Sequence, residues 1–198
     1  MASDSFALLG LPRSACLSPD EIRAAFQKAA ATAHPDAAAH NADRAARTLL
    51  FQQINEASGI LTPVASRLKH LLALEAPGFI PSRAAPMDDA LVALFSEVGS
   101  AVQLAAAWTR DRLAATTFLA KASLTAREMQ VQEALEAAGA SLRLAQESLA
   151  ASLPGLEAMR STGPVPTEAL HTLAQRASFL EKWQSQLQSA WGALFAAS

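Results

Sequence analysis

Apolar residues recur at helical spacing along most of the chain, between a few breaks marked by proline. The first long stripe follows Ser18-Pro19-Asp20-Glu21, which combines an N-cap serine, proline at the first helical position and glutamate at the third. We therefore expect a helix to begin at Pro19. Because Pro35 disfavours helical backbone at the residue before it, the helix should end near Ala33. Its apolar face consists of Ile22, Ala25, Phe26, Ala29 and Ala33.

A second long helix is predicted from about residue 43 to residue 61, where Thr62-Pro63 breaks it. Its stripe is Leu50, Ile54, Ala57 and Leu61. The two helices should form an antiparallel hairpin whose loop, from His34 to about Asn41, presents His34, Pro35 and Asp36. A short apolar turn over 6–11 and a further helix over 64–74 complete this part of the chain.

The segment 75–86 contains Pro77, Gly78, Pro81 and Pro86 between strongly helical stretches, so no regular helix should run through it. We expect an N-terminal domain over 1–76, a proline-rich linker over 77–86 and a C-terminal domain over 87–198.

Three helices are predicted after the linker. The first runs from Met87 to about residue 122, and the second opens at the capping-box pattern Thr125-Ala126-Arg127-Glu128. Leu153-Pro154-Gly155 should disturb or end the second helix, and the third should span about 166–195. Short connections favour an up-down three-helix bundle. Alanine is abundant and tyrosine absent, which also favours helix over strand, so the predicted fold class is all-α.

The composition of the chain makes two classes of partner, nucleic acids and membranes, unexpected. There are 16 Lys+Arg against 18 Asp+Glu, a formal net charge of -2, so a nucleic-acid partner is not expected. No stretch approaches the roughly 20 uninterrupted apolar residues that cross a bilayer, and the N-terminus lacks a signal-peptide pattern, so we expect a cytoplasmic protein without a membrane partner.

No catalytic set is recognisable in the sequence. His34, His40, His70 and His171 lack metal-site spacing, Cys16 is the single cysteine, and no glycine-rich phosphate loop occurs. We expect no metal, no cofactor and no enzymatic activity.

Three segments together resemble the DnaJ J-domain in order and spacing: residues 21–28, His34-Pro35-Asp36, and residues 51–57. The resemblance implies a co-chaperone whose HPD loop stimulates the ATPase of a DnaK-type heat-shock chaperone. The implied contact residues are His34, Pro35 and Asp36, with Arg23 and Lys28 on the preceding helix. That helix carries fewer basic residues than most J-domains, so long-range attraction to an acidic chaperone surface should be weaker.

Residues 67–74 and 178–182 are similar to the corresponding segments of HscB-type iron–sulfur assembly J-proteins. This resemblance implies an HscA-type partner and a C-terminal bundle that binds an iron–sulfur scaffold protein. Leu94, Phe95 and Glu97 match its client-binding stretch, although Leu94 and Phe95 also fit a bundle core. Two alternatives are a J-protein with another client and a helical adaptor that stimulates no ATPase.

Overall fold

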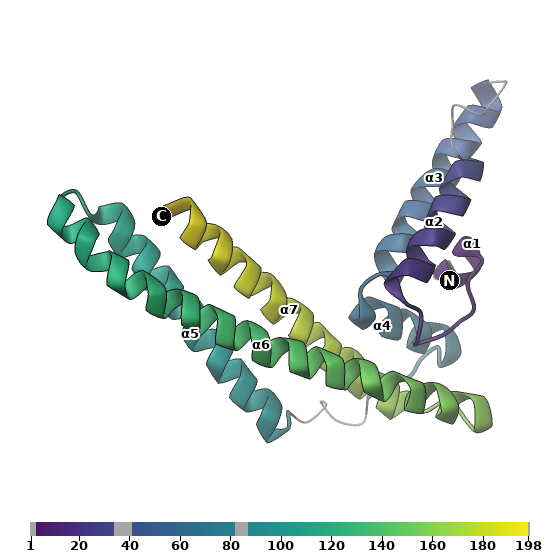
Figure 1. The fold of residues 1–198 in the computed structure, drawn as a ribbon. Coiled ribbons are helices and arrows are strands. Elements are labelled where there is room, and N and C mark those ends of the chain that lie inside the picture. Colours follow the sequence, from purple (N-terminus) through teal and green to yellow (C-terminus); the bar gives the residue numbers. More distant parts are fainter. Residues whose placement is uncertain (1–2, 34–40, 82–86, 198) are drawn as a thin grey trace. The chain divides into compact units, whose positions relative to one another are not determined.

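The computed structural model describes residues 3–33, 41–81 and 87–197, and within these ranges it is built from helices without strands (Figure 1). The helices are α1 Ser5–Leu9, α2 Pro19–Ala33, α3 Asn41–Leu61, α4 Val64–Glu75, α5 Asp89–Ala114, α6 Phe118–Thr162 and α7 Thr167–Ala197. The all-α prediction is confirmed.

The chain divides into two compact units. Unit 1 comprises Met1–Ala85 with Ala150–Ser178, and unit 2 comprises Pro86–Leu149 with Phe179–Ser198. The first unit thus contains the end of α6 and the beginning of α7 besides α1 to α4. The domain boundaries at residues 76 and 87 remain predictions.

The start of α2 follows the predicted capping box. The hydroxyl of Ser18 accepts a hydrogen bond from the backbone N–H of Glu21 at 3.2 Å, and Glu21 Oε2 accepts one from the backbone N–H of Ser18 at 2.7 Å. These bonds satisfy two backbone donors that a helix start leaves open. The bond from the Ser18 backbone lowers the pKa of Glu21 most, and the Ser18 hydroxyl, which donates to Glu21 Oε2 at 2.7 Å, lowers it further.

The predicted apolar turn is the short helix α1. Asp4 caps it by accepting from the backbone N–H groups of Phe6 and Ala7 at 3.0 and 3.2 Å. Gly10 ends it with a φ of 66°, a left-handed conformation that glycine adopts without steric cost.

The core of unit 1 joins the N-terminal helices to parts of α6 and α7. Phe6, Ile22, Leu61, Leu68 and Leu71 are almost fully buried. Leu153, Leu156, Leu170 and Ala174 belong to the same buried cluster. Each fully buried leucine contributes about 1.5–3 kcal/mol through the hydrophobic effect.

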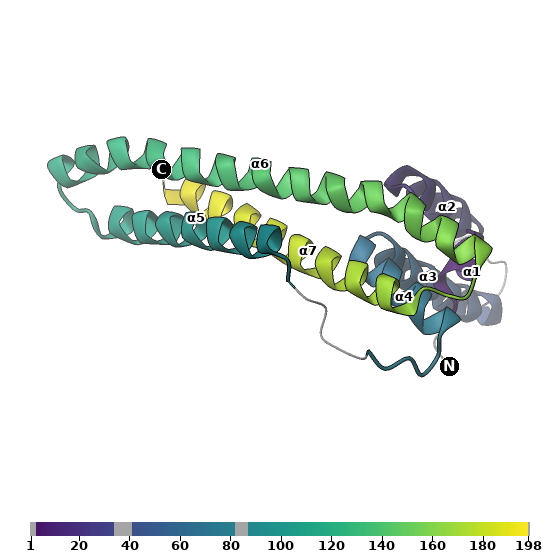
Figure 2. The same cartoon turned by 90° about the horizontal axis from the view of Figure 1, so that it is seen from below.

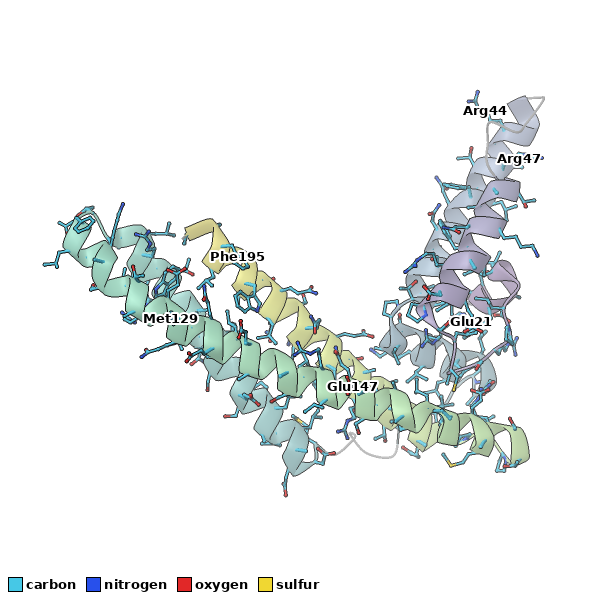
Figure 3. All side chains as sticks on the ribbon, viewed as in Figure 1. Glu21, Arg44, Arg47, Met129, Glu147 and Phe195 are labelled. Atoms are coloured by element: carbon cyan, nitrogen blue, oxygen red, sulfur yellow. The ribbon has the colours of Figure 1, made fainter. Side chains whose placement is uncertain are left out.

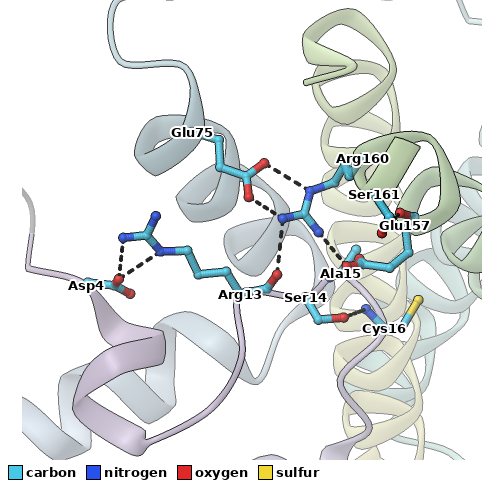
Figure 4. A network of polar contacts seen from close by, with 9 residues as sticks. All are labelled: Asp4, Arg13, Ser14, Ala15, Cys16, Glu75, Glu157, Arg160 and Ser161. Atoms are coloured by element: carbon cyan, nitrogen blue, oxygen red, sulfur yellow. Dashed lines mark hydrogen bonds and ion pairs between the residues drawn. The ribbon is translucent and has the colours of Figure 1, made fainter. Parts of the chain in front are cut away.

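Polar contacts also hold α6 against the N-terminal helices of unit 1 (Figure 4). Arg160 of α6 donates from Nε to Glu75 Oε2 at 3.0 Å and from Nη1 to Glu157 Oε1 at 2.7 Å. Glu157 Oε2 accepts from the backbone N–H of Ala15 at 2.9 Å, and Arg160 donates to the carbonyl of Arg13 at 3.1 Å. One arginine of α6 therefore holds the end of α4 and the loop before α2.

Two predicted helix boundaries in the C-terminal part are wrong. The first helix after the linker ends at Ala114 rather than near residue 122. The next begins at Phe118, so Thr125 lies inside a helix, where its hydroxyl donates to the carbonyl of Lys121. The cap is Thr117, whose hydroxyl accepts from the backbone N–H of Ala120 at 3.2 Å.

Pro154 does not end α6, which continues to Thr162. A proline in a helix interior costs about 3 kcal/mol. Leu153 and Leu156, on either side of it, are 7% and 1% exposed in the core of unit 1. Their burial offsets that cost and keeps the segment helical.

In unit 2, α5, α6 and α7 run side by side around a core of leucines and alanines with two buried tryptophans, Trp108 and Trp183 (Figure 2). Trp108 is fully buried and donates from Nε1 to the carbonyl of Leu124 at 3.0 Å. Among the described residues α5 alone is long and apolar enough to cross a membrane, but core helices of soluble proteins share that property.

Candidate functional site

The central predicted site residues, His34, Pro35 and Asp36, lie outside the described residues. The structure does describe the two helices on either side of them: α2 ends at Ala33, and α3 begins at Asn41. The two helices pack against each other (Figure 1), and Arg47 near the start of α3 meets Thr32 at the end of α2, so the antiparallel hairpin predicted from the sequence is present.

Arg47 of α3 reaches the end of α2 next to this loop. Its Nη1 donates to the carbonyl of Thr32 at 2.9 Å, two residues before His34. The last carbonyls of a helix have no partner within the helix, and a cation near them interacts favourably with the helix dipole. Arg44 and Arg47 both lie at this end of the hairpin (Figure 3). Sequence analysis missed Arg47, because its partner is a backbone atom of another helix.

The two predicted basic contact residues of α2 differ in environment. Arg23 forms an ion pair with Asp20 at 3.0 Å, and both side chains are exposed. Exposed pairs of this kind are weak, typically about 0–1 kcal/mol, so Arg23 can change partner at small cost. Lys28 lies on the face of α2 that borders a groove.

This groove, about 600 Å³ in volume, is formed by α1, α2 and α3 and has a mainly apolar lining. Small side chains of α2, including Ala25 and Ala29, leave the space open, and Leu50 of α3 is 40% exposed at its border. The groove therefore offers an apolar surface beside a single lysine.

His70 of α4 anchors the start of α1. Its Nε2 accepts a hydrogen bond from the backbone N–H of Ser5 at 3.1 Å, and its ring stacks on Phe6 at 5.7 Å between centroids. Partial burial lowers the pKa of His70, with Arg13 acting in the same direction and Asp4 opposing it. An imidazole that accepts through Nε2 must be unprotonated there.

The three predicted client-binding residues differ in exposure: Leu94 is buried, Phe95 is exposed and Glu97 is half-buried. Leu94 is 6% exposed and packs in the core of unit 2, which is the position that its apolar stripe also allowed, and its contact with a client stays a prediction. Phe95 is 56% exposed, so it does not occupy the core position that the sequence also allowed, and its role in client binding stays a prediction. Glu97 accepts a hydrogen bond from the hydroxyl of Ser141 at 3.0 Å.

Phe95 belongs to an aromatic cluster that joins α5 to α7. Its ring centroid lies 6.0 Å from that of Trp183, and Phe179 stacks on Trp183 at 5.9 Å. Val92, one turn before Phe95, is 48% exposed. We call Val92, Phe95 and Phe179 the aromatic surface; Trp183, which contacts both phenylalanines, is buried beneath it and 3% exposed. Sequence analysis placed Phe179 in a family-like segment but did not connect it with Phe95, because the two residues are far apart in the chain.

The described residues offer little other chemistry. Within those ranges no three His, Cys, Asp or Glu side chains gather into a metal-ligand group. Partial burial raises the pKa of the Cys16 thiol, and the Glu157 carboxylate adds to this effect. A raised pKa leaves less of the thiolate, which is the nucleophilic form.

Comparisons with known proteins agree with these features. Residues 4–70 match the DnaJ domain family. The chain is similar in structure to chaperone HscB from Vibrio cholerae, with a TM-score of 0.63 and 21% sequence identity, over 97% of this chain and 99% of that one. No curated protein matches the chain.

Residues 4–70, which include the α2–α3 hairpin, belong to the DnaJ domain family, and a J-domain implies an ATPase partner of the Hsp70 class. The chain as a whole has an HscB-like fold, with a J-domain followed by long bundle helices.

Proposed function

We propose that the protein is a co-chaperone that stimulates a DnaK- or HscA-type ATPase through His34, Pro35 and Asp36 and delivers a client held on its bundle. The client we propose is an iron–sulfur scaffold protein. The protein itself acts without a cofactor, is not an enzyme and works in the cytoplasm.

The observation that carries the chaperone half is the J-domain match over 4–70, together with an HPD sequence between α2 and α3. Pro35 restricts the backbone, and Asp36 supplies a carboxylate able to accept a bidentate arginine from the ATPase. Arg47 supports this role, since it holds the carbonyl of Thr32 at the end of α2.

The proposal that the bundle binds a client rests on the aromatic surface. Monomeric proteins bury most large aromatic side chains, and exposed aromatic groups rimmed by polar residues often mark interaction sites. Phe95 is 56% exposed and contacts α7 through Trp183, whereas Glu97, two positions further along α5, faces α6 and accepts from Ser141. An exposed apolar centre of this kind suits a client segment with apolar side chains.

A client-retention experiment tests both halves at once. An immobilised DnaK-type chaperone is incubated with ATP, scaffold protein and this chain, and the scaffold retained after washing is measured. We expect retention with the wild type and its loss in both Asp36→Asn and Phe95→Ser, whereas Asp111→Asn serves as a control on exposed α5 surface. Retention that is equal in all four chains would contradict the proposal.

Depletion of basic residues on α2 favours a second candidate, an adaptor that binds a client without stimulating an ATPase. Arg23 and Lys28 are the only basic residues of α2, and Arg23 has to leave its weak pair with Asp20 before it can meet a chaperone. If the protein is such an adaptor, the isolated chain should bind the client, and adding ATP and the chaperone should not change how much client is bound.

A further inference from the structure

The connection between α5 and α6 concentrates exposed apolar side chains. Leu113 is 74% exposed, Phe118 88% and Leu119 79%. In both views α5 and α6 extend past the C-terminal end of α7, and their connection is the end of unit 2 (Figures 1 and 2). We call residues 110–121 the hairpin tip.

Exposure of this kind needs an explanation, because transferring a Leu or Phe side chain out of water gains about 1.5–3 kcal/mol. Single exposed apolar residues are normal on protein surfaces. Here three lie within seven positions, and two of them are adjacent in sequence. The bundle core does not require them, since Trp108 and Leu124 close it on either side of the tip.

The charges around the tip are mainly positive, although the whole chain has a net charge of -2. Residues 98–128 contain four Arg and Lys against Asp111 and Glu128. Asp111 is paired with Arg127 at 3.2 Å. Arg110 and Lys121, on the two helices that meet at the tip, are exposed and make no ion pair with any residue that the structure describes.

We infer that the hairpin tip docks on a lipid surface with anionic headgroups. Phe118, Leu119 and Leu113 enter the interface between headgroups and acyl chains, and Arg110 and Lys121 meet the phosphates. Apolar residues with nearby Lys and Arg are the pattern of interfacial binding, and each cation near an anionic surface contributes about 1 kcal/mol. This contact differs from a membrane span, because α5 buries its apolar stripe in the bundle core.

Surface complementarity favours lipid over a second copy of the chain. Two copies meeting tip to tip would bring Arg110 and Lys121 of one against the same cations of the other. Three side chains and two free cations also predict a weak, reversible contact, because even one myristoyl chain gives only marginal binding.

Vesicle co-sedimentation of the full chain tests the inference. Vesicles contain phosphatidylcholine alone, or phosphatidylcholine with a third replaced by phosphatidylglycerol. We expect binding to the anionic vesicles that weakens as salt is added. Arg110→Gln with Lys121→Gln should lower the partition constant roughly 30-fold, since each cation accounts for about fivefold. Phe118→Ser with Leu119→Ser should lower it at least tenfold or so.

The matched control is Leu144→Ser with Arg143→Gln, which removes another exposed leucine and an exposed arginine from α6. It should bind as the wild type does. A second measurement uses Thr116→Cys in a Cys16→Ser chain, labelled with a polarity-sensitive dye. Its emission should shift to the blue with anionic vesicles.

Three results would overturn the inference: no binding to either vesicle, tip variants that bind as the wild type does, or a dye that does not respond. Analytical ultracentrifugation without lipid tests whether a second copy of the chain binds the hairpin tip. Self-association that the tip variants abolish would assign the surface to a second copy instead.

Discussion

Arg160 and Glu75 form an ion pair across 85 positions of sequence, and it ties α6 to the end of α4 within unit 1. Only 9% of the Arg160 side chain and 15% of the Glu75 side chain are exposed. The hydrogen bond to Glu75 is the main reason that the pKa of Arg160 is raised. Arg160 is therefore charged whenever the protein is folded, and its neighbours must balance that charge.

Replacing Arg160 should consequently destabilise the protein. Arg160→Ala leaves the carboxylates of Glu75 and Glu157 without their partner in a site with little solvent, and removing one member of a buried pair costs about 3–5 kcal/mol. We expect a loss near the lower end, measured by urea unfolding. The control is Arg23→Ala, whose exposed pair with Asp20 should cost less than about 1 kcal/mol. Equal losses in the two variants would refute a role for the buried pair.

This pair also shows where sequence reasoning stops. Glu75 and Arg160 belong to separate helices, and nothing in their local sequence indicates that they meet. The start of α2, in contrast, was predicted because Ser18 and Glu21 interact with each other three positions apart. Local hydrogen bonding is readable from spacing, whereas tertiary ion pairs are not.

The errors in the bundle have a related origin. Thr125-Ala126-Arg127-Glu128 has the spacing of a capping box, but the helix begins at Phe118, after a cap at Thr117. Alanine-rich sequence on both sides of the connection hides the break, since it favours helix throughout. At Pro154 the local rule fails because burial of Leu153 and Leu156 outweighs the missing hydrogen bond.

Stability should depend on pH through His70. Its folded pKa lies below the ordinary value of 6.5, mainly because of burial. Between the two values the unfolded chain binds more protons than the folded one, so stability increases with pH across that window. The stabilisation is complete above 6.5 and is lost as the pH falls through the folded pKa.

The measurement is urea unfolding of the wild type and His70→Gln from pH 5 to pH 8. The wild type should lose stability toward the acid end, and the variant should lose less, because glutamine does not titrate there. The amide of Ser5, followed by NMR, should report protonation directly, since it donates to His70 Nε2. An equal acid loss in both chains would show that other groups cause it.

Adjacent residues of α5 should respond to substitution in opposite ways. Leu94 is buried, so Leu94→Ala should cost about 3 kcal/mol of unfolding free energy by leaving a cavity. Phe95 is exposed and contacts Trp183, so Phe95→Ala should cost about 1 kcal/mol or less. Client capture should follow the reverse order, with the larger loss in Phe95→Ala at temperatures where both variants are folded. Weaker capture in Leu94→Ala than in Phe95→Ala would move the client site elsewhere.

Arg47 should affect ATPase stimulation through the end of α2. Arg47→Met removes the hydrogen bond to the Thr32 carbonyl, which is worth about 1 kcal/mol, so the concentration of the chain that gives half-maximal stimulation should rise roughly fivefold. Arg47→Lys keeps the charge and should restore part of the effect. Wild-type stimulation by Arg47→Met would mean that this bond does not support the site.

The most direct test of the account is single-turnover ATP hydrolysis by DnaK-type chaperones, with increasing concentrations of this chain. We predict that the wild type and Asp111→Asn accelerate hydrolysis to the same plateau, and that Asp36→Asn has no effect although its helical circular dichroism is unchanged. Failure of the folded wild type to accelerate any of these chaperones would contradict the co-chaperone function.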